Sequence, residues 1–199
     1  EIIDLLELIH EDISGIKIGL QYITQRSPEE IRELSKFKKP IFYDGKFFDI
    51  KNTLIESIKS LEKLDVNYAT VHLLNGLDAL KSTNEAAQKI DLNLLGVSVL
   101  TSFDDNDLAQ LGFKNKMEDQ VAKLIKIAVE ANLYGVICSP LEVKMIKQIS
   151  PTLKCFTPGI RMNENKNDQK RTMSANEAIK EGSDCLIIGR PITKGNPKE

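Results

Sequence analysis

The fold is decided by the stretch Pro40-Ile41-Phe42-Tyr43-Asp44-Gly45-Lys46-Phe47-Phe48-Asp49, in which an apolar run leads directly into a charged run. The apolar part, Pro40–Tyr43, is typical of a buried parallel strand. Asp44 and Lys46 follow at the strand end, and residues two apart on a strand point to the same face. Asp49 is out of phase with them, so we expect it to project elsewhere, including toward another subunit.

Short apolar runs of the same kind recur along almost the whole chain. Most are continuously apolar rather than alternating, as expected for parallel strands covered by helices. The predicted strands are Gly15–Leu20, Pro40–Tyr43, Tyr68–His72, Leu94–Leu100, Tyr134–Cys138, Leu153–Phe156 and Cys185–Ile188.

Amphipathic runs between these strands predict helices. Ser27 is a suitable N-cap for a helix that begins at Pro28, and Gly182 is a suitable C-cap for the last helix. The other predicted helices are Ile2–Ile9, Asn52–Leu64, Met117–Ala131, Leu141–Gln148 and Ser174–Glu181, the last of which precedes Gly182. Alternation of strands and helices predicts β-α-β units and therefore a parallel sheet.

We therefore predict an α/β protein with a (β/α)8 TIM barrel, formed by residues 1–199 as a single domain. Seven strands are visible, whereas a closed barrel of this kind has eight. Because the chain begins within the predicted helix Ile2–Ile9, and a barrel helix follows a strand, we expect the first strand to precede Glu1. The last helix is likewise expected to be absent after Pro191-Ile192-Thr193.

The composition is that of an ordinary globular protein, with 41% hydrophobic and 28% charged residues among 199. The formal net charge of −2 gives no bulk indication of a nucleic-acid or membrane-surface partner. No stretch approaches the roughly 20 apolar residues of a membrane helix. We therefore expect neither nucleic acid nor membrane as a partner.

The remaining reactive side chains have ordinary structural explanations. The cysteines Cys138, Cys155 and Cys185 lie in apolar segments without metal-ligand spacing, which predicts reduced buried thiols in a cytoplasmic protein without a bound metal. The acidic run Asp104–Asp107 is predicted to be a solvated loop and helix cap rather than a cation site. His72, at a strand end, is predicted to be structural rather than a catalytic base.

Two late strands end in glycine and arginine, at Gly159-Ile160-Arg161 and at Gly189-Arg190. In (β/α) barrels, phosphate commonly binds at the loops after the last two strands. Glycine lets backbone N–H groups approach a phosphate closely, and arginine offers a bidentate charged partner. Together these strand ends predict a phosphorylated substrate.

At these residues the sequence resembles the orotidine 5′-phosphate decarboxylase family, whose members convert orotidine monophosphate to UMP and CO2 in de novo pyrimidine biosynthesis. The matching motifs occur in the family's order and span nearly the whole chain. The D-x-K-x-x-D element is shared with related sugar-phosphate enzymes, whereas the T-P-G-I-R and D-Q-x-R elements are more specific. The motifs are Lys17-Ile18-Gly19, residues 44–53, residues 96–102, Thr157-Pro158-Gly159-Ile160-Arg161, Asp168-Gln169-Lys170-Arg171 and residues 189–193.

The resemblance implies a role for each matching residue. Lys46 would protonate C6 after CO2 leaves, with Asp44 and Lys17 in the same charged array. Asp49 and Thr53 would reach into the site of a partner subunit, so the functional unit would be a homodimer with shared active sites. The catalytic residues would be Lys46, Asp44 and Asp49. The substrate-binding residues would be Lys17 and Thr53, together with Thr101 at the pyrimidine region and Arg161, Gln169, Gly189 and Arg190 at the phosphate.

The resemblance also implies that no cofactor takes part, so the barrier must fall by electrostatics around the developing carbanion. The family's first strand supplies an Asp that contacts the ribose, and no residue of these 199 can take that part. Lys51 also departs from the family, which usually has proline or another non-basic residue there.

Two alternatives stay open. One is a metal-dependent sugar-phosphate decarboxylase or lyase of the same superfamily, against which the D-Q-x-R element argues. The other is a non-catalytic phosphate-binding barrel, which the full set of charged residues disfavours.

Overall fold

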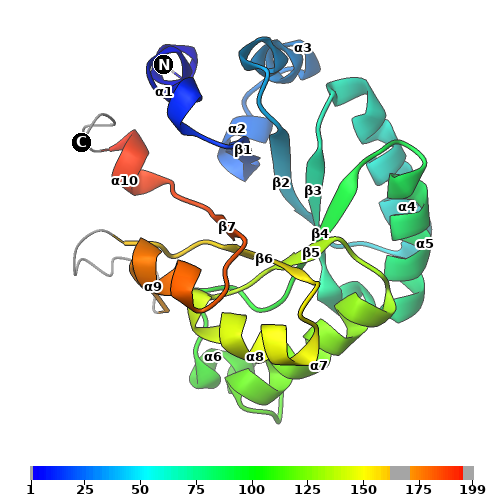
Figure 1. Ribbon diagram of the computed structural model, residues 1–199. Helices are drawn as coiled ribbons and strands as arrows, with labels where there is room; N and C mark the ends of the chain where they lie inside the picture. The colour runs from blue at the N-terminus through cyan, green and yellow to red at the C-terminus, as the bar shows by residue number, and fades with distance from the viewer. Residues whose placement is uncertain (1, 162–170, 195–199) are drawn as a thin grey trace.

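The structure is a computed structural model that describes residues 2–161 and 171–194. Within these residues, seven parallel strands form one sheet in the order in which they occur along the chain. Figure 1 shows the strands gathered around the centre of the molecule, with helices outside them. The strands are β1 (Ile16–Gly19), β2 (Ile41–Phe47), β3 (Tyr68–His72), β4 (Asn93–Val97), β5 (Gly135–Ile137), β6 (Lys154–Thr157) and β7 (Cys185–Leu186).

Helices connect successive strands, as parallel pairing requires. The α-helices are α1 (Ile2–Ile9), α2 (Leu20–Ile23), α3 (Pro28–Arg32), α4 (Lys51–Ser60), α5 (Leu77–Gln88), α6 (Asp105–Gln110), α7 (Met117–Glu130), α8 (Val143–Ile149), α9 (Ala175–Lys180) and α10 (Arg190–Thr193). Shorter 3-10 turns are η1 (His10–Asp12), η2 (Glu33–Phe37), η3 (Leu61–Leu64), η4 (Leu73–Asn75) and η5 (Pro140–Glu142).

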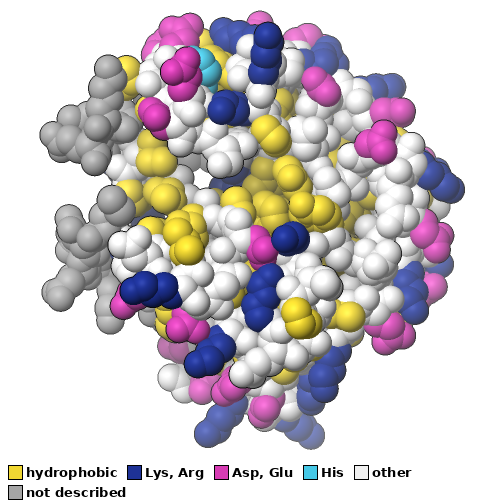
Figure 2. Space-filling model, viewed as in Figure 1, with side chains coloured by type: hydrophobic (Ala, Val, Ile, Leu, Met, Phe, Trp, Pro, Cys, Tyr) yellow, Lys and Arg dark blue, Asp and Glu magenta, His cyan; other side chains and the backbone are white. Residues whose placement is uncertain are grey.

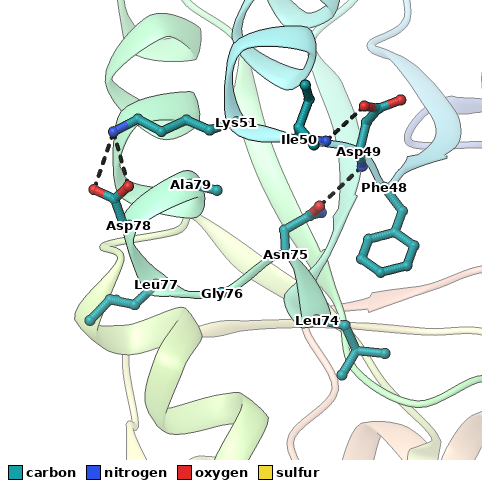
Figure 3. A pocket seen from close by; sticks show the side chains of 10 residues that line it. All are labelled: Phe48, Asp49, Ile50, Lys51, Leu74, Asn75, Gly76, Leu77, Asp78 and Ala79. Carbon is teal, nitrogen blue, oxygen red and sulfur yellow. Dashed lines mark hydrogen bonds and ion pairs between the residues drawn. The ribbon is translucent and has the colours of Figure 1, made fainter.

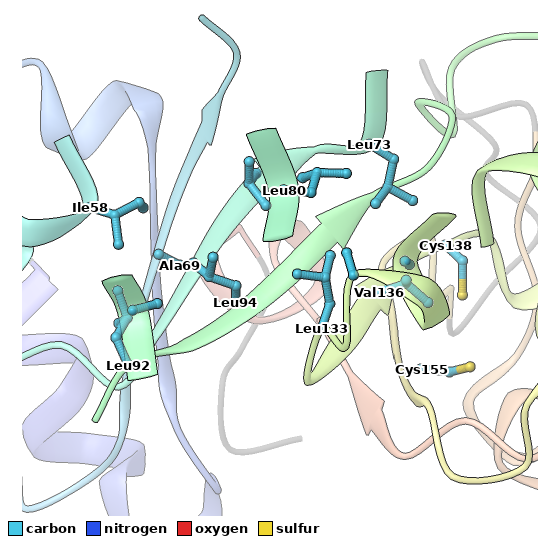
Figure 4. Packing of buried hydrophobic residues seen from close by; sticks show 14 of the residues in the cluster. Ile58, Ala69, Leu73, Leu80, Leu92, Leu94, Leu133, Val136, Cys138 and Cys155 are labelled. Atoms are coloured by element: carbon cyan, nitrogen blue, oxygen red, sulfur yellow. The ribbon is translucent and has the colours of Figure 1, made fainter. Parts of the chain in front are cut away.

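The sheet separates two hydrophobic clusters because successive side chains on a strand point to opposite faces. The larger cluster lies between the sheet and the outer helices, and it includes Ile58, Leu80 and Leu94 (Figure 4). The smaller cluster is built around Phe42, Leu95 and Phe156, on the other face of the same strands. In Figure 2, hydrophobic side chains gather over the middle of the face shown, and charged side chains surround them. The α/β class and the parallel sheet are therefore confirmed.

Local sequence explains several helix ends. Ser27 caps α3 with a capping box to Glu30, and Pro28 occupies the first turn. Asp104 caps α6 through the same motif with Asp107, so the predicted helix cap in the acidic run is confirmed. Gly182 follows α9 with φ of 102°, a conformation in which glycine has no steric cost.

The predicted elements agree with the structure except at a few places. β2 is longer than predicted, since it continues through the charged residues to Phe47. The predicted strand Leu94–Leu100 ends earlier, at Val97. α2, α5, α6 and α10 were not among the predicted helices. The longest of them, α5, has a buried face that carries small and polar residues such as Ala79, Thr83 and Asn84.

Within residues 2–161 and 171–194, no helix is long and apolar enough to cross a membrane. Cys138 and Cys155 are buried and Cys185 is partly buried, and all three are free thiols. The predicted burial is therefore confirmed for Cys138 and Cys155, whereas Cys185 is only partly buried.

Candidate active site

The candidate active site begins where β2 departs from regular pairing with β3. Tyr43 pairs with Ala69 and Phe47 pairs with Val71, so three residues of β2 lie opposite the single residue Thr70. A bulge of this kind re-aims side chains and is common beside active sites. The three residues are Asp44, Gly45 and Lys46.

Asp44 and Lys46 come together as their spacing predicted. The Lys46 Nζ atom lies 2.8 Å from both carboxylate oxygens of Asp44. Lys17, from the adjacent strand β1, donates to Asp44 Oδ2 at 3.2 Å. One carboxylate therefore joins two ammonium groups from neighbouring strands.

Burial and charge oppose each other at Asp44, whose residue surface is only 8% exposed. Burial alone would raise the pKa of this carboxyl, but Lys17 and Lys46 outweigh it and hold the pKa of Asp44 below its ordinary value. His72, nearby on β3, has a lowered pKa because of its burial and the positive charge of Lys46. The two lysines therefore favour the ionised form of Asp44, whereas burial and Lys46 favour the uncharged form of His72.

Gly45 leaves room for the rings of Tyr43 and Phe47, which flank it in β2. The rings of Tyr43 and Phe47 stack with centroids 5.9 Å apart and an interplanar angle of 7°. A Cβ atom at Gly45 would lie 2.9 Å from Tyr43 Cε1, which is too close for any other residue without movement of the ring. The small residue therefore lets the two rings pack together on the side away from the charged array.

Asp49 lies outside the charged array, as its spacing predicted. Its side chain is exposed, and its backbone N–H donates to Asn75 Oδ1 at 3.1 Å. The Asn75 amide also donates to the carbonyl oxygens of Phe47 and His72, so it fixes the segment after β2. Thr53, in the first turn of α4, is exposed as well.

A surface hollow of about 600 Å³ adjoins Asp49. Figure 3 shows Asn75 reaching the backbone of Asp49, while Lys51 and Asp78 face each other between α4 and α5. The exposed side chains of Phe48, Ile50 and Leu74 surround this region and are 63%, 74% and 42% exposed.

The predicted phosphate residues lie at the other side of the sheet, after β6 and β7. Arg161 is partly buried, and its Nη1 donates to the Ile160 carbonyl at 2.8 Å. Gly189 is exposed, and a Cβ atom there would meet nothing within 4 Å. Arg190 begins α10, whose Ile192 and Thr193 N–H groups return to the Gly189 carbonyl. Gln169 lies outside the described residues.

Arg171 links this side to the middle of the sheet. Its guanidinium contacts the buried carboxylate of Glu142 and donates to the carbonyls of Val99 and Leu100, at 3.3 and 3.0 Å. Leu100 directly precedes Thr101, which is partly buried. Backbone bonds between Met173 and residues Gly159 and Arg161 hold the neighbouring segment. The Arg171 guanidinium therefore joins the loops after β4, β5 and β6, through one ion pair and two hydrogen bonds to backbone carbonyls.

Sequence reasoning missed Thr70, Asn75, Glu142 and Arg171 as parts of this rim, although Arg171 stood in a quoted motif. Thr70 is a polar residue within an apolar strand, which is a weak signal for a role. Asn75 and Glu142 act through contacts with residues 26 to 29 positions away, and sequence spacing cannot indicate these. Among residues 2–161 and 171–194, no three His, Cys, Asp or Glu side chains converge as a metal site.

The fold and site together define a class: an α/β protein with a parallel, curled sheet whose carboxyl-terminal rim holds a Lys–Asp–Lys array. Active sites of (β/α) barrels lie at this rim. Over residues 1–199 the chain matches the family described as Orotidine 5'-phosphate decarboxylase / HUMPS, and it belongs to that family.

Similar proteins carry the name of the same family. A protein of Wolbachia pipientis subsp. Culex pipiens (strain wPip), named orotidine 5'-phosphate decarboxylase, is 39% identical over 189 residues, which are 94% of this chain and 84% of the relative. A Legionella pneumophila (strain Lens) protein of the same name is 38% identical and covers 99% of this chain and 89% of its own length. The crystal structure of orotidine 5'-phosphate decarboxylase from Lactobacillus acidophilus superposes with a TM-score of 0.81 at 30% identity, covering 96% of this chain and 88% of that one.

Proposed function

We propose that this protein is a carboxy-lyase that converts orotidine monophosphate to UMP and CO2 in de novo pyrimidine biosynthesis, without a cofactor. The observation that carries the proposal is the Asp44 carboxylate in contact with the ammonium groups of Lys17 and Lys46. The family name covers both orotidine 5'-phosphate decarboxylases and a HUMPS branch. The choice of substrate is supported by the relatives, which are named orotidine 5'-phosphate decarboxylase.

The reaction requires one bond to break and one to form. When the C6–carboxylate bond of the pyrimidine breaks, CO2 leaves and the electron pair stays on C6. Lys46 then gives a proton from Nζ to C6, which forms the C6–H bond of UMP, and Lys46 regains its proton from solvent. A fixed ammonium beside C6 stabilises the developing negative charge, and such preorganised charge is often the largest single contribution to catalysis.

Asp44 and Lys17 hold the proton donor in place. Asp44 contacts Lys46 through both oxygens, so rotation of the lysine side chain is restricted. Lys17 places a second ammonium group against the Asp44 carboxylate and would lie near the ribose end of the substrate. The array therefore exists before substrate binds, and little reorganisation is needed during reaction.

The far end of the substrate would be held by Arg161, Gln169, Gly189 and Arg190, which we assign to the phosphate. Thr101 is assigned to the pyrimidine. Contacts to a phosphate that does not react supply binding energy that can position the base against Lys46.

The decisive experiment mixes the full-length protein with orotidine monophosphate and measures ultraviolet absorbance, UMP and CO2. We expect UMP and CO2 in equal amounts, and unchanged rates in a chelator. Turnover of a sugar phosphate that chelator abolishes, with orotidine monophosphate inert, would instead establish the metal-dependent alternative. If neither substrate reacts, the protein is a non-catalytic phosphate-binding barrel.

We also propose a homodimer in which Asp49 and Thr53 enter the site of the partner subunit. Both side chains are exposed, and the apolar side chains of Phe48 and Ile50 flank Asp49. Exposed apolar patches of this kind are typical of protein interfaces.

Mixing two inactive variants tests the shared site. Lys46→Ala and Asp49→Ala chains that form mixed dimers would leave one intact site per mixed dimer, so about one quarter of all sites should recover activity. Mixing either variant with itself is the control. Recovery of no activity in dimers proven to be mixed would show that Asp49 serves its own subunit.

Three predictions remain for the whole protein. β1 pairs only with β2 and β7 only with β6 in the described sheet, so an additional strand between β7 and β1 would complete the (β/α)8 barrel of one domain. A structure of the full-length protein tests this. We further propose a cytoplasmic enzyme with no nucleic-acid or membrane partner, which cell fractionation tests.

A further inference from the structure

Thr70 is a polar side chain in the middle of β3, and it is completely buried. It is the single residue that faces the bulge formed by Asp44, Gly45 and Lys46. A hydroxyl can accept one hydrogen bond and donate another, and Thr70 does both.

The two hydrogen bonds of Thr70 reach the two central residues of the charged array. Its Oγ1 accepts from the backbone N–H of Lys46 at 2.8 Å. The same oxygen donates to Asp44 Oδ1 at 3.0 Å. Thr70 therefore fixes the backbone of one residue and the side chain of the other.

The backbone of Lys46 needs such support. Its φ angle is 48°, in the left-handed region that costs a residue with a Cβ atom about 1 kcal/mol. Non-glycine residues persist in this conformation only where the surroundings hold them there. The hydrogen bond from the Lys46 backbone N–H to Thr70 is such a restraint, because it ties this residue of the bulge to the middle of β3.

We propose that Thr70 is a positioning residue for decarboxylation: its hydroxyl sets the direction in which Lys46 leaves β2 and the orientation of the Asp44 carboxylate. This inference deepens the proposed function and rests on it. Thr70 does not touch the reacting atoms. It acts through Lys46, the proposed proton donor, and through Asp44, which holds Lys46 in place. A donor misplaced by about 1 Å can lose on the order of 100-fold in rate.

Substitutions at Thr70 isolate the hydroxyl. Thr70→Val removes it and keeps a branched side chain, whereas Thr70→Ser keeps it and removes the methyl group. Thr70→Ala and Thr70→Ser form a second pair that differ only in the hydroxyl, should the valine variant fail to fold. Thr83→Val is the matched control, because Thr83 is equally buried but bonds to Ala79 within α5.

The first measurement compares kcat and KM of the full-length variants with orotidine monophosphate. We expect Thr70→Val and Thr70→Ala to lose about 10- to 100-fold in kcat, with KM changed by less than about 3-fold, because ground-state binding is largely independent of Lys46 alignment. The kcat of Thr70→Ser should stay within about 3-fold of the parental kcat, and the kcat of Thr83→Val should equal the parental kcat.

The pH profile of kcat/KM provides a second reading. Asp44 is faced by Lys17 on β1, by Lys46 on β2 and by Thr70 on β3, and His72 on β3 interacts electrostatically with Lys46. Loss of the Thr70 donor removes one hydrogen bond from the ionised carboxylate, which raises the pKa of Asp44. The acid limb should therefore move upward by about half a pH unit or more in Thr70→Val and Thr70→Ala, but not in Thr70→Ser or Thr83→Val.

Equal kcat values for the serine and alanine variants would overturn the proposal, as would a loss confined to KM. Both outcomes presuppose that the parent protein turns over orotidine monophosphate. Absence of that parent activity would instead contradict the proposed function.

Discussion

The two sides of the rim are built differently. On the β1–β3 side, the charged array is held by side chains on adjacent paired strands, with four residues of β1 in register with β2. On the β6–β7 side, only two residue pairs join the strands, and the predicted phosphate residues lie in the segments that follow. The charges that contact each other therefore lie on strands, whereas the residues predicted to bind phosphate lie on loops.

A further difference lies in what holds each side together. The charged array is held by direct contacts between neighbouring strands, made by Lys17, Asp44, Lys46 and Thr70. The phosphate side is connected by Arg171, which spans from its own segment to Glu142 and to the segment before Thr101. Substitutions in the charged array should therefore lower mainly kcat, whereas substitution of Arg171 should lower mainly the free energy of unfolding.

The largest effect should come from Lys46→Ala on the array side. We expect kcat to fall at least about 10⁴-fold, because the proposed mechanism would lose both its proton donor and the fixed charge beside C6. Asp44 keeps Lys17 as a partner in this variant, so the free energy of unfolding should fall less than in Arg171→Met, which denaturation measures. Lys59→Ala, an exposed lysine of α4 paired with Glu56, is the control. A Lys46→Ala enzyme with parental kcat would show that the array is structural.

Arg171→Met should have the next largest effect, and it should appear in stability. Glu142 is 6% exposed and would be left as a buried carboxylate without its cation. Removing one partner of a buried ion pair typically costs about 3–5 kcal/mol of unfolding free energy, which urea denaturation measures. Arg32→Met removes an exposed pair with Glu29 and should cost little. Equal losses for both variants would contradict the special role of Arg171.

The smallest effect should come from Asp184→Asn, at the start of β7. Asp184 accepts hydrogen bonds from Lys147, Lys154 and the backbone N–H of Cys155, which fasten β7 to β6. Burial works against these partners, but they prevail and hold the pKa of Asp184 below its ordinary value of 3.8. We expect a loss of about 0.5–1 kcal/mol at neutral pH, since the pair is near the surface.

The sign of this effect with pH follows from the lowered pKa. A carboxyl with a lowered folded-state pKa stabilises the protein above its unfolded pKa, and that contribution disappears as pH falls through the folded value. The difference in unfolding free energy between parent and Asp184→Asn should therefore be constant above about pH 5 and shrink toward pH 3. A difference that grows on acidification would contradict the assignment.

The sequence by itself determined most of the strands, because continuous apolar runs such as those at residues 94–97 and 135–137 are typical of parallel strands covered by helices. It also determined that Asp44 and Lys46 meet and that Asp49 does not join them. These are consequences of local periodicity, which the order of residues encodes directly.

Only the tertiary structure decided how that meeting is achieved. The bulge, the left-handed Lys46 and the hydroxyl of Thr70 opposite them depend on the register between β2 and β3. The contact of Arg171 with Glu142 depends likewise on how loops 29 residues apart are brought together. Local spacing carries no information about either, because both arise from packing between segments that are distant in the sequence.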